Sequence, residues 1–315
     1  MIIQEKTQRI MAELGKVVVG QEQFLKELVC AFLSGGHVLM EGVPGLGKTL
    51  SAKALSRTVS ADFKRIQFTP DLMPSDILGT SVFDMKTSEF NIKKGPVFTN
   101  ILLADEINRT PPKTQSALLE AMEERSVTID GETFRLSEPF FVIATQNPVE
   151  YEGTYPLPEA QLDRFLMKLR ISYISREQED MLLGAYTGNY SGAHGRVDGL
   201  ARVITPEELS ACRNEAAGVR VDESIIHYIT ELTFATRRSP LILLGASPRA
   251  SIALLLCSRT LAAMNGRDYV IPEDVVDLAL PVMRHRIILK PEAGVDGSDA
   301  DSILANVIRK VEIPR

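Results

Sequence analysis

The chain has 315 residues, of which 44% are hydrophobic and 24% are charged, and its formal net charge at pH 7 is −6. This length suits two domains, or one large and one small domain, and the composition is ordinary for a soluble globular protein. The negative balance argues against broad nucleic-acid binding, which usually needs a basic face, although a local basic loop is compatible with it. No apolar run approaches the length of a bilayer span, so we expect no transmembrane segment.

The three cysteines, Cys30, Cys212 and Cys257, are widely spaced and form no Cys-x-x-Cys pair. Cys30 and Cys257 lie in apolar helical segments, so we expect buried, unreactive thiols in a reducing compartment. Residues 1–6 contain no hydrophobic signal-peptide core. These features together predict a cytoplasmic protein.

Apolar and helical segments alternate through the first half of the chain. Strands are predicted at residues 37–41, 64–68, 100–105, 140–145 and 167–171. Helices are predicted at residues 4–15, 21–33, 48–57 and 113–125. Several strand candidates are continuous apolar runs, as expected for parallel strands that are covered on both faces. The alternation indicates a doubly wound α/β domain.

Two segments interrupt this alternation. Residues 70–99 are too long for a plain connection, and we expect a short helix at 71–78 and a hairpin at 82–92 within them. Residues 126–136 predict a second hairpin, because an Asp-Gly turn at 130–131 is flanked by alternating apolar side chains.

The strand pattern stops near residue 175, and helices are predicted beyond it. They span residues 175–186, 205–217, 222–237, 247–265 and 272–284. Residues 188–199 are Gly-rich and polar, which is typical of a loop. We place the domain boundary near residue 173, which gives an α/β domain at 1–173 and a smaller all-helical domain at 174–315.

Residues 42–49 match the phosphate-binding P-loop, in which two glycines separated by four residues precede Lys48 and Thr49. A strand candidate before this segment and a helix candidate after it distinguish the motif from an ordinary Gly-rich turn. The loop would direct backbone N–H groups at phosphate oxygens, Lys48 would reach the β- and γ-phosphates, and Thr49 would bind Mg²⁺. The predicted nucleotide-binding residues of this loop are Gly42, Val43, Pro44, Gly45, Leu46, Gly47, Lys48, Thr49 and Leu50.

An acidic pair, Asp105-Glu106, closes the apolar strand candidate at 100–105. Beside a P-loop this is the Walker B arrangement, which predicts Asp105 as a Mg²⁺ ligand and Glu106 as the general base for an attacking water. Acids at a strand end are also common without any such role. A built-in glutamate favours direct hydrolysis over a site of the small-GTPase type, which lacks it.

Three further polar side chains are candidates for catalysis at the γ-phosphate. Asn147 follows the strand at 140–145 and would bind the water or the phosphate, although Asn-Pro is also a turn signal. Arg164 precedes the fifth strand and fits an arginine finger, with a surface Arg–Asp pair as the alternative. Arg249 begins an apolar helix, where it would reach the γ-phosphate or remain at the surface.

The guanine-specific pattern Asn-Lys-x-Asp does not occur in the sequence, so ATP is the expected nucleotide. Val18, Val19 and Gly20 are candidates for adenine contacts, and core packing is the alternative for them. The expected cofactors are therefore ATP and Mg²⁺.

Taken together, these segments resemble the MoxR family of AAA+ ATPases over nearly the whole chain, residues 4–290. The phrases LLADEINR, PPKTQSALLEAMEE, ATQNP and PEAQLDRF are similar to that family beyond the general AAA+ motifs. The resemblance is carried by residues 42–49, 101–109, 145–148, 155–165 and 245–250.

The resemblance implies a P-loop AAA+ core with a five-stranded parallel sheet in the order 5-1-4-3-2 and a smaller all-helical lid. Within the core, 70–94 would be the helix-2 insert of this clade and 126–136 its pre-sensor-1 hairpin. The implied roles are Walker A for Lys48 and Thr49, Walker B for Asp105 and Glu106, sensor 1 for Asn147, the arginine finger for Arg164 and sensor 2 for Arg249.

The resemblance also implies a homo-oligomeric ring, usually a hexamer, in which ATP hydrolysis remodels, assembles or activates a client protein. Such clients often contain a von Willebrand factor A domain. Arg164 would come from the neighbouring subunit, whereas Arg249 would hold the γ-phosphate from the lid, with action in cis or in trans left open. Arg109 and Arg125 either contact the neighbouring subunit or face solvent.

Three alternatives stay open. The first is a motor subunit of the magnesium-chelatase type, and the second is a scaffold that is gated by ATP and has negligible turnover. The third is a DNA-remodelling ATPase, which the negative net charge disfavours. The insert contains no evident aromatic–glycine pore loop, so remodelling by motion of lid and insert is expected over threading.

Overall fold

The computed structural model describes residues 1–147, 153–186, 197–295 and 299–314. Its centre is a parallel sheet of five strands: β1 (Val38–Glu41), β2 (Phe63–Gln67), β5 (Ile101–Asp105), β8 (Phe141–Gln146) and β9 (Met167–Arg170). They lie in the order β2-β5-β8-β1-β9. When the five are numbered along the chain and read from the β9 edge, this order is 5-1-4-3-2, which confirms the prediction.

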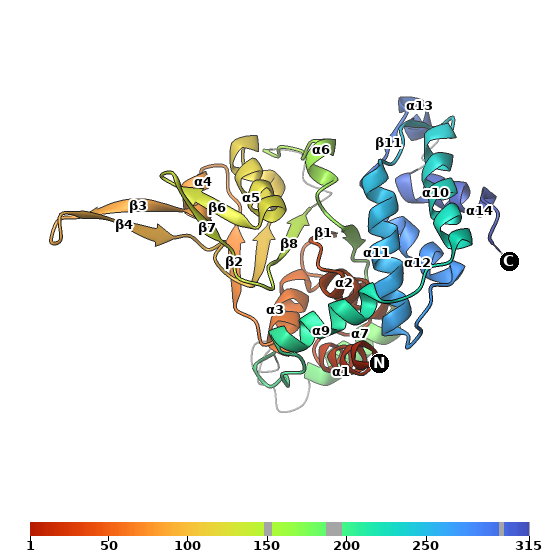
Figure 1. Ribbon diagram of the computed structural model, residues 1–315, viewed down its shortest axis with the longest axis horizontal. Helices are drawn as coiled ribbons and strands as arrows, with labels where there is room; N and C mark the ends of the chain where they lie inside the picture. The colour runs from red at the N-terminus through yellow and green to blue at the C-terminus, as the bar shows by residue number, and fades with distance from the viewer. Residues whose placement is uncertain (148–152, 187–196, 296–298, 315) are drawn as a thin grey trace.

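Alternate side chains of these strands enter two separate hydrophobic cores. Val38 and Leu103 belong to one core, whereas Leu39 and Leu102 belong to the other. Because both faces are covered, the strands consist of continuous apolar runs. The first core is covered by α1 (Ile2–Gly15), α2 (Glu22–Ser34) and α3 (Lys48–Thr58), and the second by α5 (Pro112–Glu124) (Figure 1).

Both predicted hairpins are present. One pairs β3 (Gly79–Asp84) with β4 (Glu89–Lys94) after the short helix α4 (Pro74–Leu78), and it projects from the body of the molecule (Figure 1). The other pairs β6 (Ser126–Ile129) with β7 (Glu132–Arg135). Its turn places Asp130 at φ 48° and Gly131 at φ 85°, the left-handed conformations that an Asp-Gly turn favours.

In the part of the second half that the structure describes, the five predicted helices are present, and further helices follow them. The predicted ones are α7 (Arg176–Tyr186), α9 (Pro206–Ala217), α10 (Glu223–Arg238), α11 (Pro248–Met264) and α12 (Pro272–Met283). The chain continues into α13 (Pro291–Val295) and α14 (Ala300–Lys310). The lid is not purely helical, because β10 (Ile242–Leu244) pairs antiparallel with β11 (Ile288–Leu289). Strands this short carry no readable period-two pattern. The predicted loop at 188–199 lies largely outside the described residues.

The first hydrophobic core continues into the second half of the chain. Phe32 of α2 and Leu254 of α11 belong to it together, and α2 contacts both β9 and α11, so α2 packs between the sheet and the lid. The boundary near residue 173 falls between β9 and α7 and stays a prediction. Among the described residues, none of the helices has the length and apolar character that crossing a membrane requires.

The three cysteines are buried and unpaired, as predicted. Burial raises the pKa of the Cys257 thiol to about 12 and that of the Cys212 thiol to about 11. Cys30 is fully buried, and burial also raises its pKa. All three thiols are therefore protonated and unreactive near neutral pH.

Candidate nucleotide-binding site

The P-loop connects the end of β1 to the start of α3. Gly45 and Gly47 adopt φ angles of +87° and +88°, in the left-handed region that favours glycine. At Gly42 the reason for glycine is space, since a Cβ there would lie 3.0 Å from the backbone oxygen of Ile171. Lys48 Nζ donates to the carbonyl oxygen of Gly42 at 2.8 Å. The lysine side chain therefore folds back onto the first residue of the loop, and the loop ends at the N-terminus of α3.

The other strand-end candidates lie at the same edge of the sheet. Asp105 is the last residue of β5 and Glu106 follows it, and Asn147 follows β8, which lies between β5 and β1. Because these strands are parallel, their carboxyl ends and the P-loop meet at one edge. The cleft at this edge has a volume of about 420 Å³ and is lined by Pro44, Gly45, Gly47, Lys48, Thr49, Leu50, Arg65, Gln67, Asp105 and Glu106. Asn147 is buried and is not among the described residues that line the cleft.

The Asp105 carboxylate forms an ion pair with the guanidinium of Arg65. Its Oδ1 accepts a hydrogen bond from the Thr145 hydroxyl at 2.6 Å, and its Oδ2 lies 2.6 Å from Nη2 of Arg65. A carboxylate and the Thr49 hydroxyl in one cleft are oxygen ligands of the kind that Mg²⁺ prefers. In the described part of the chain no group of three or more His, Cys, Asp or Glu side chains is arranged to hold a metal ion, so phosphates and water would supply the remaining ligands.

The backbone of Glu106 is in the left-handed region, with φ 58°, and its N–H donates to Thr145 Oγ1 at 2.8 Å. Its carboxylate oxygen Oε2 accepts from Gln67 Nε2 at 2.6 Å and pairs with Arg109 Nε at 3.0 Å. The predicted base is thus held by two partners, Gln67 at the end of β2 and Arg109 in the 3-10 helix Ile107–Arg109 that follows β5. Sequence reasoning missed Gln67 and Arg65. Their alternation around the buried Ile66 is the signal that both point to one face.

Arg164 and Arg249 lie far from this cleft, at the other end of β1. Leu166 N donates to the carbonyl oxygen of His37 at 2.8 Å, and His37 directly precedes β1, whereas the P-loop follows it. A four-residue strand spans about 13 Å. Both arginines pair with one side chain, Glu123 of α5. The structure therefore brings the two arginines together but does not bring them to the P-loop of the same chain.

The remaining candidates have mixed surroundings. Val18 is buried in the first core, which fits the core-packing alternative. Val19 and Gly20 are half-buried, Gly20 lies against the side chain of Gln178, and adenine contact stays a prediction for both. Arg125 Nη1 pairs with Glu138 at 2.9 Å and is partly exposed.

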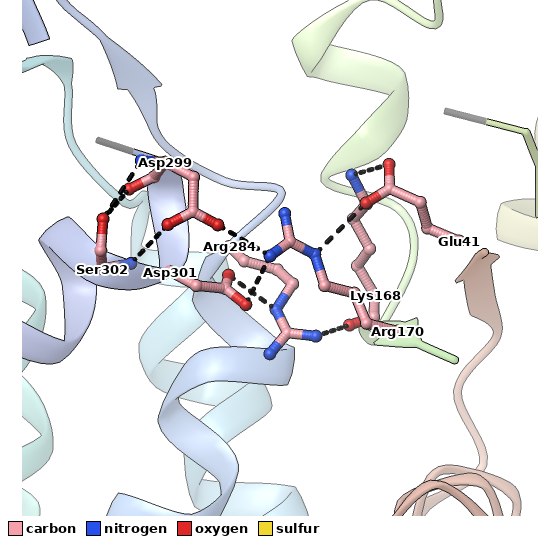
Figure 2. A network of polar contacts seen from close by, with 7 residues as sticks. All are labelled: Glu41, Lys168, Arg170, Arg284, Asp299, Asp301 and Ser302. Carbon is pink, nitrogen blue, oxygen red and sulfur yellow. Dashed lines mark hydrogen bonds and ion pairs between the residues drawn. The ribbon is translucent and has the colours of Figure 1, made fainter. Parts of the chain in front are cut away.

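A chain of ion pairs connects the residue before the P-loop to the lid (Figure 2). Glu41, the last residue of β1, pairs with Lys168 Nζ at 2.7 Å and with Arg170 Nε at 3.3 Å. Nη1 of Arg170 in turn pairs with Asp299 at 3.0 Å and with Asp301 at 2.8 Å. These two acids begin α14, so the C-terminal helix is attached to the P-loop strand through charged side chains.

Comparisons with known proteins agree with this geometry. Residues 37–167 match the ATPase family associated with various cellular activities (AAA), and residues 234–307 match the AAA lid domain. The uncharacterized protein YeaC of Bacillus subtilis (strain 168) is 49% identical over 306 residues, which cover 97% of this chain and 94% of that protein. Chaperone MoxR1 of Mycobacterium tuberculosis is 42% identical over 317 residues, which cover 98% of this chain and 82% of that protein.

A solved crystal structure of a protein from Cytophaga hutchinsonii is similar along the whole chain. Its TM-score is 0.90 at 44% sequence identity, and the match covers 99% of this chain and 96% of that one. The identity and coverage of these relatives, with the AAA and AAA lid matches, establish the family. This chain belongs to the MoxR family of AAA+ ATPases, which are nucleotide-binding proteins.

Proposed function

We propose that this protein hydrolyses ATP in the cleft between the P-loop and the end of β5, and that a second copy of the chain completes the site. The observation that carries the proposal is the division of the polar residues into two groups. Lys48, Asp105 and Glu106 gather at one end of β1, and Arg164 and Arg249 gather at the other. Neither group is a complete site for phosphoryl transfer alone.

Within the cleft, the P-loop amides and Lys48 would bind the β- and γ-phosphates. Glu106 would take a proton from the attacking water, for which its carboxylate has to turn away from Gln67 and Arg109. Asn147 would hold that water or the γ-phosphate. When bound between Thr49 and Asp105, Mg²⁺ would neutralise charge on the phosphates.

The neighbouring copy would supply the arginines. Arg164 is proposed as the arginine finger, a role that contributes ~10³–10⁵ in rate in comparable enzymes. Of the two possibilities left open for Arg249, we propose action in trans, because Arg249 shares a carboxylate with Arg164 at the far end of β1. Head-to-tail contacts of this kind form a ring when the rotation between copies closes and a filament when it does not, and we propose a closed hexameric ring.

Mixing two inactive variants tests this arrangement. Lys48→Ala chains should fail to bind ATP, and Arg164→Ala chains should bind ATP without efficient turnover. When they are mixed, an Arg164→Ala site next to a Lys48→Ala chain regains a complete set of residues, so activity should return. Mixtures as inactive as their components would reject a shared site, and unchanged ATP affinity in Lys48→Ala would reject the P-loop assignment.

We further propose that turnover remodels a client protein, such as one with a von Willebrand factor A domain. Support comes from the relative named as a chaperone and from the β3–β4 hairpin, which exposes Phe83, Met85 and Phe90. A Glu106→Gln chain held in the ATP state should capture the client, and Lys48→Ala should not. Equal capture by both would mean that binding is independent of nucleotide.

A further inference from the structure

One carboxylate of α5 binds both arginines that are proposed to act on a neighbouring γ-phosphate. Glu123 Oε2 lies 2.9 Å from Nη2 of Arg164, and Glu123 Oε1 lies 3.1 Å from Nη2 of Arg249. Arg164 follows α6 (Glu159–Leu162), and Arg249 lies in the first turn of α11. The contact therefore joins the end of α5, the segment before β9 and the lid.

The backbones that carry the two arginines are joined separately, through Asp163. Its Oδ2 accepts a hydrogen bond at 3.0 Å from the hydroxyl of Ser247, the N-cap residue of α11. Its Oδ1 accepts one at 2.7 Å from Arg286, whose side chain is 3% exposed and also donates to the Phe165 carbonyl. These contacts fix the two backbones, but they leave the long arginine side chains free to rotate.

The Glu123 carboxylate supplies the constraint that the backbone contacts lack. Two guanidinium groups brought to one place repel each other, and the side chains of Arg164 and Arg249 are 32% and 54% exposed. A carboxylate between them offsets the repulsion and restricts both side chains. Each guanidinium has five N–H donors, and the pairing with Glu123 is through Nη2 in each, so donors remain for a phosphate.

On the basis of the proposed function, we infer that Glu123 is a positioning residue that presents Arg164 and Arg249 side by side to one ATP in the neighbouring copy. Glu123 is not among the described residues that line its own chain's cleft. It follows Met122, whose carbonyl contacts His37 at the start of β1, opposite the P-loop. Removing the carboxylate should therefore impair the neighbour's site and spare the site of its own chain.

The test uses the mixed assembly of Lys48→Ala chains, which donate arginines, and Arg164→Ala chains, which bind ATP. Adding Glu123→Gln to the donor chain should lower the restored turnover by about tenfold to a hundredfold, as expected when catalytic groups lose their orientation. The same change on the ATP-binding chain should leave the restored turnover unaltered. In both cases ATP affinity should stay constant. Glu124→Gln, the same charge change one residue along α5, is the matched control.

The outcomes distinguish the positioning role of Glu123 from the proposed ATPase site that two copies share. If donor-side Glu123→Gln leaves the restored turnover unchanged or increases it, Glu123 has no positioning role, although the shared site still stands. If the loss is equal on the donor and on the ATP-binding chain, the effect is a general structural one and the inference is wrong. If the unmodified chain hydrolyses no ATP, or if the starting mixture regains none, the proposed function fails, and the role of Glu123 fails with it.

Discussion

The guanidinium of Arg65 binds the carboxylate of Asp105 through two contacts to one oxygen, with Nη2 at 2.6 Å and Nε at 3.0 Å from Oδ2. Nη2 of Arg65 also donates to Gln67 Oε1 at 2.8 Å, and Gln67 Nε2 donates to Glu106. The proposed metal ligand and the proposed base are thus connected through two side chains of β2. A metal ion that takes Oδ2 has to displace Arg65, and the displacement also frees the oxygen of Gln67.

Replacing Arg65 with Gln should lower the Mg²⁺ concentration required for ATP binding. The guanidinium competes with the metal for Asp105, and a partly exposed ion pair of this kind contributes ~0.2–1 kcal/mol, which corresponds to a shift of a few-fold at most. The measurement is ATP binding as a function of Mg²⁺. Arg57→Gln on α3, which breaks an exposed pair with Asp198, is the control. An unchanged or higher Mg²⁺ requirement in Arg65→Gln would contradict the competition.

Replacing Glu106 with Gln should preserve ATP affinity and reduce the rate of hydrolysis by about 10²–10⁴, the range typical of a lost general base. Gln retains the size of the side chain but accepts no proton from water. Single-turnover measurements with bound ATP separate this step from product release. Glu120→Gln on the exposed face of α5 is the control. Turnover close to that of the unmodified chain would remove Glu106 as the base.

The parts of the candidate site that could be predicted from the sequence are local patterns. The P-loop, the acidic pair at 105–106 and Asn147 each follow an apolar strand, and the parallel sheet brings them to one edge. Their assignment to one nucleotide site and their chemical roles stay predictions. The strand order followed from the family resemblance, since composition and periodicity contain no information about which strands are neighbours.

The missed parts are contacts between residues distant in sequence. Arg65 reaches Asp105 from a separate strand, and Glu123 meets Arg249 from another half of the chain. Single charged side chains have no periodicity that would reveal such partners. Helix α14 could have been predicted from the sequence, because its apolar residues Ile303, Leu304 and Ile308 recur at helical spacing.

Replacing Asp301 with Asn should destabilise the attachment of α14. Asp301 pairs with Arg170 at 2.8 Å and with Arg284 at 3.1 Å, and the Arg284 side chain is only 9% exposed (Figure 2). Without the carboxylate, a largely buried guanidinium loses its charged partner, for which we expect a loss of about 1–3 kcal/mol in the free energy of unfolding. Urea denaturation measures this change.

Asp268→Asn is the control for that experiment, because Asp268 forms a pair with Arg220 in which both side chains are about 70% exposed or more. Its effect should stay within about 0.5 kcal/mol. Similar losses in the two variants would show that Asp301 contributes no more than a surface ion pair. Faster proteolysis near the C-terminus of Asp301→Asn would locate the loss in α14.

The stability of the fold should decrease as the pH falls below about 6.5, the unperturbed pKa of histidine, because His37 is buried in its neutral form. Burial lowers the pKa of His37 to about 4, and Arg125 and Arg213 add to the shift. His37 Nδ1 accepts a hydrogen bond from Val142 N at 3.0 Å, which places the ring proton on Nε2, facing the Met122 carbonyl. The ring is therefore an acceptor on one side and a donor on the other, and protonation removes the acceptor.

Between pH 6.5 and 4 the unfolded chain binds a proton at His37 that the folded chain does not. The free energy of unfolding should fall in this window by up to about 1.4 kcal/mol per pH unit for each such group. Buried His285, whose pKa is lowered mainly by burial, contributes in the same direction. Urea titrations at pH 7.5 and pH 5 measure the slope, which should be smaller in His37→Gln and unaltered in a His227→Gln control at an exposed position. If His37→Gln retains the full slope, protons taken up elsewhere account for the acid sensitivity, and His37 is not its source.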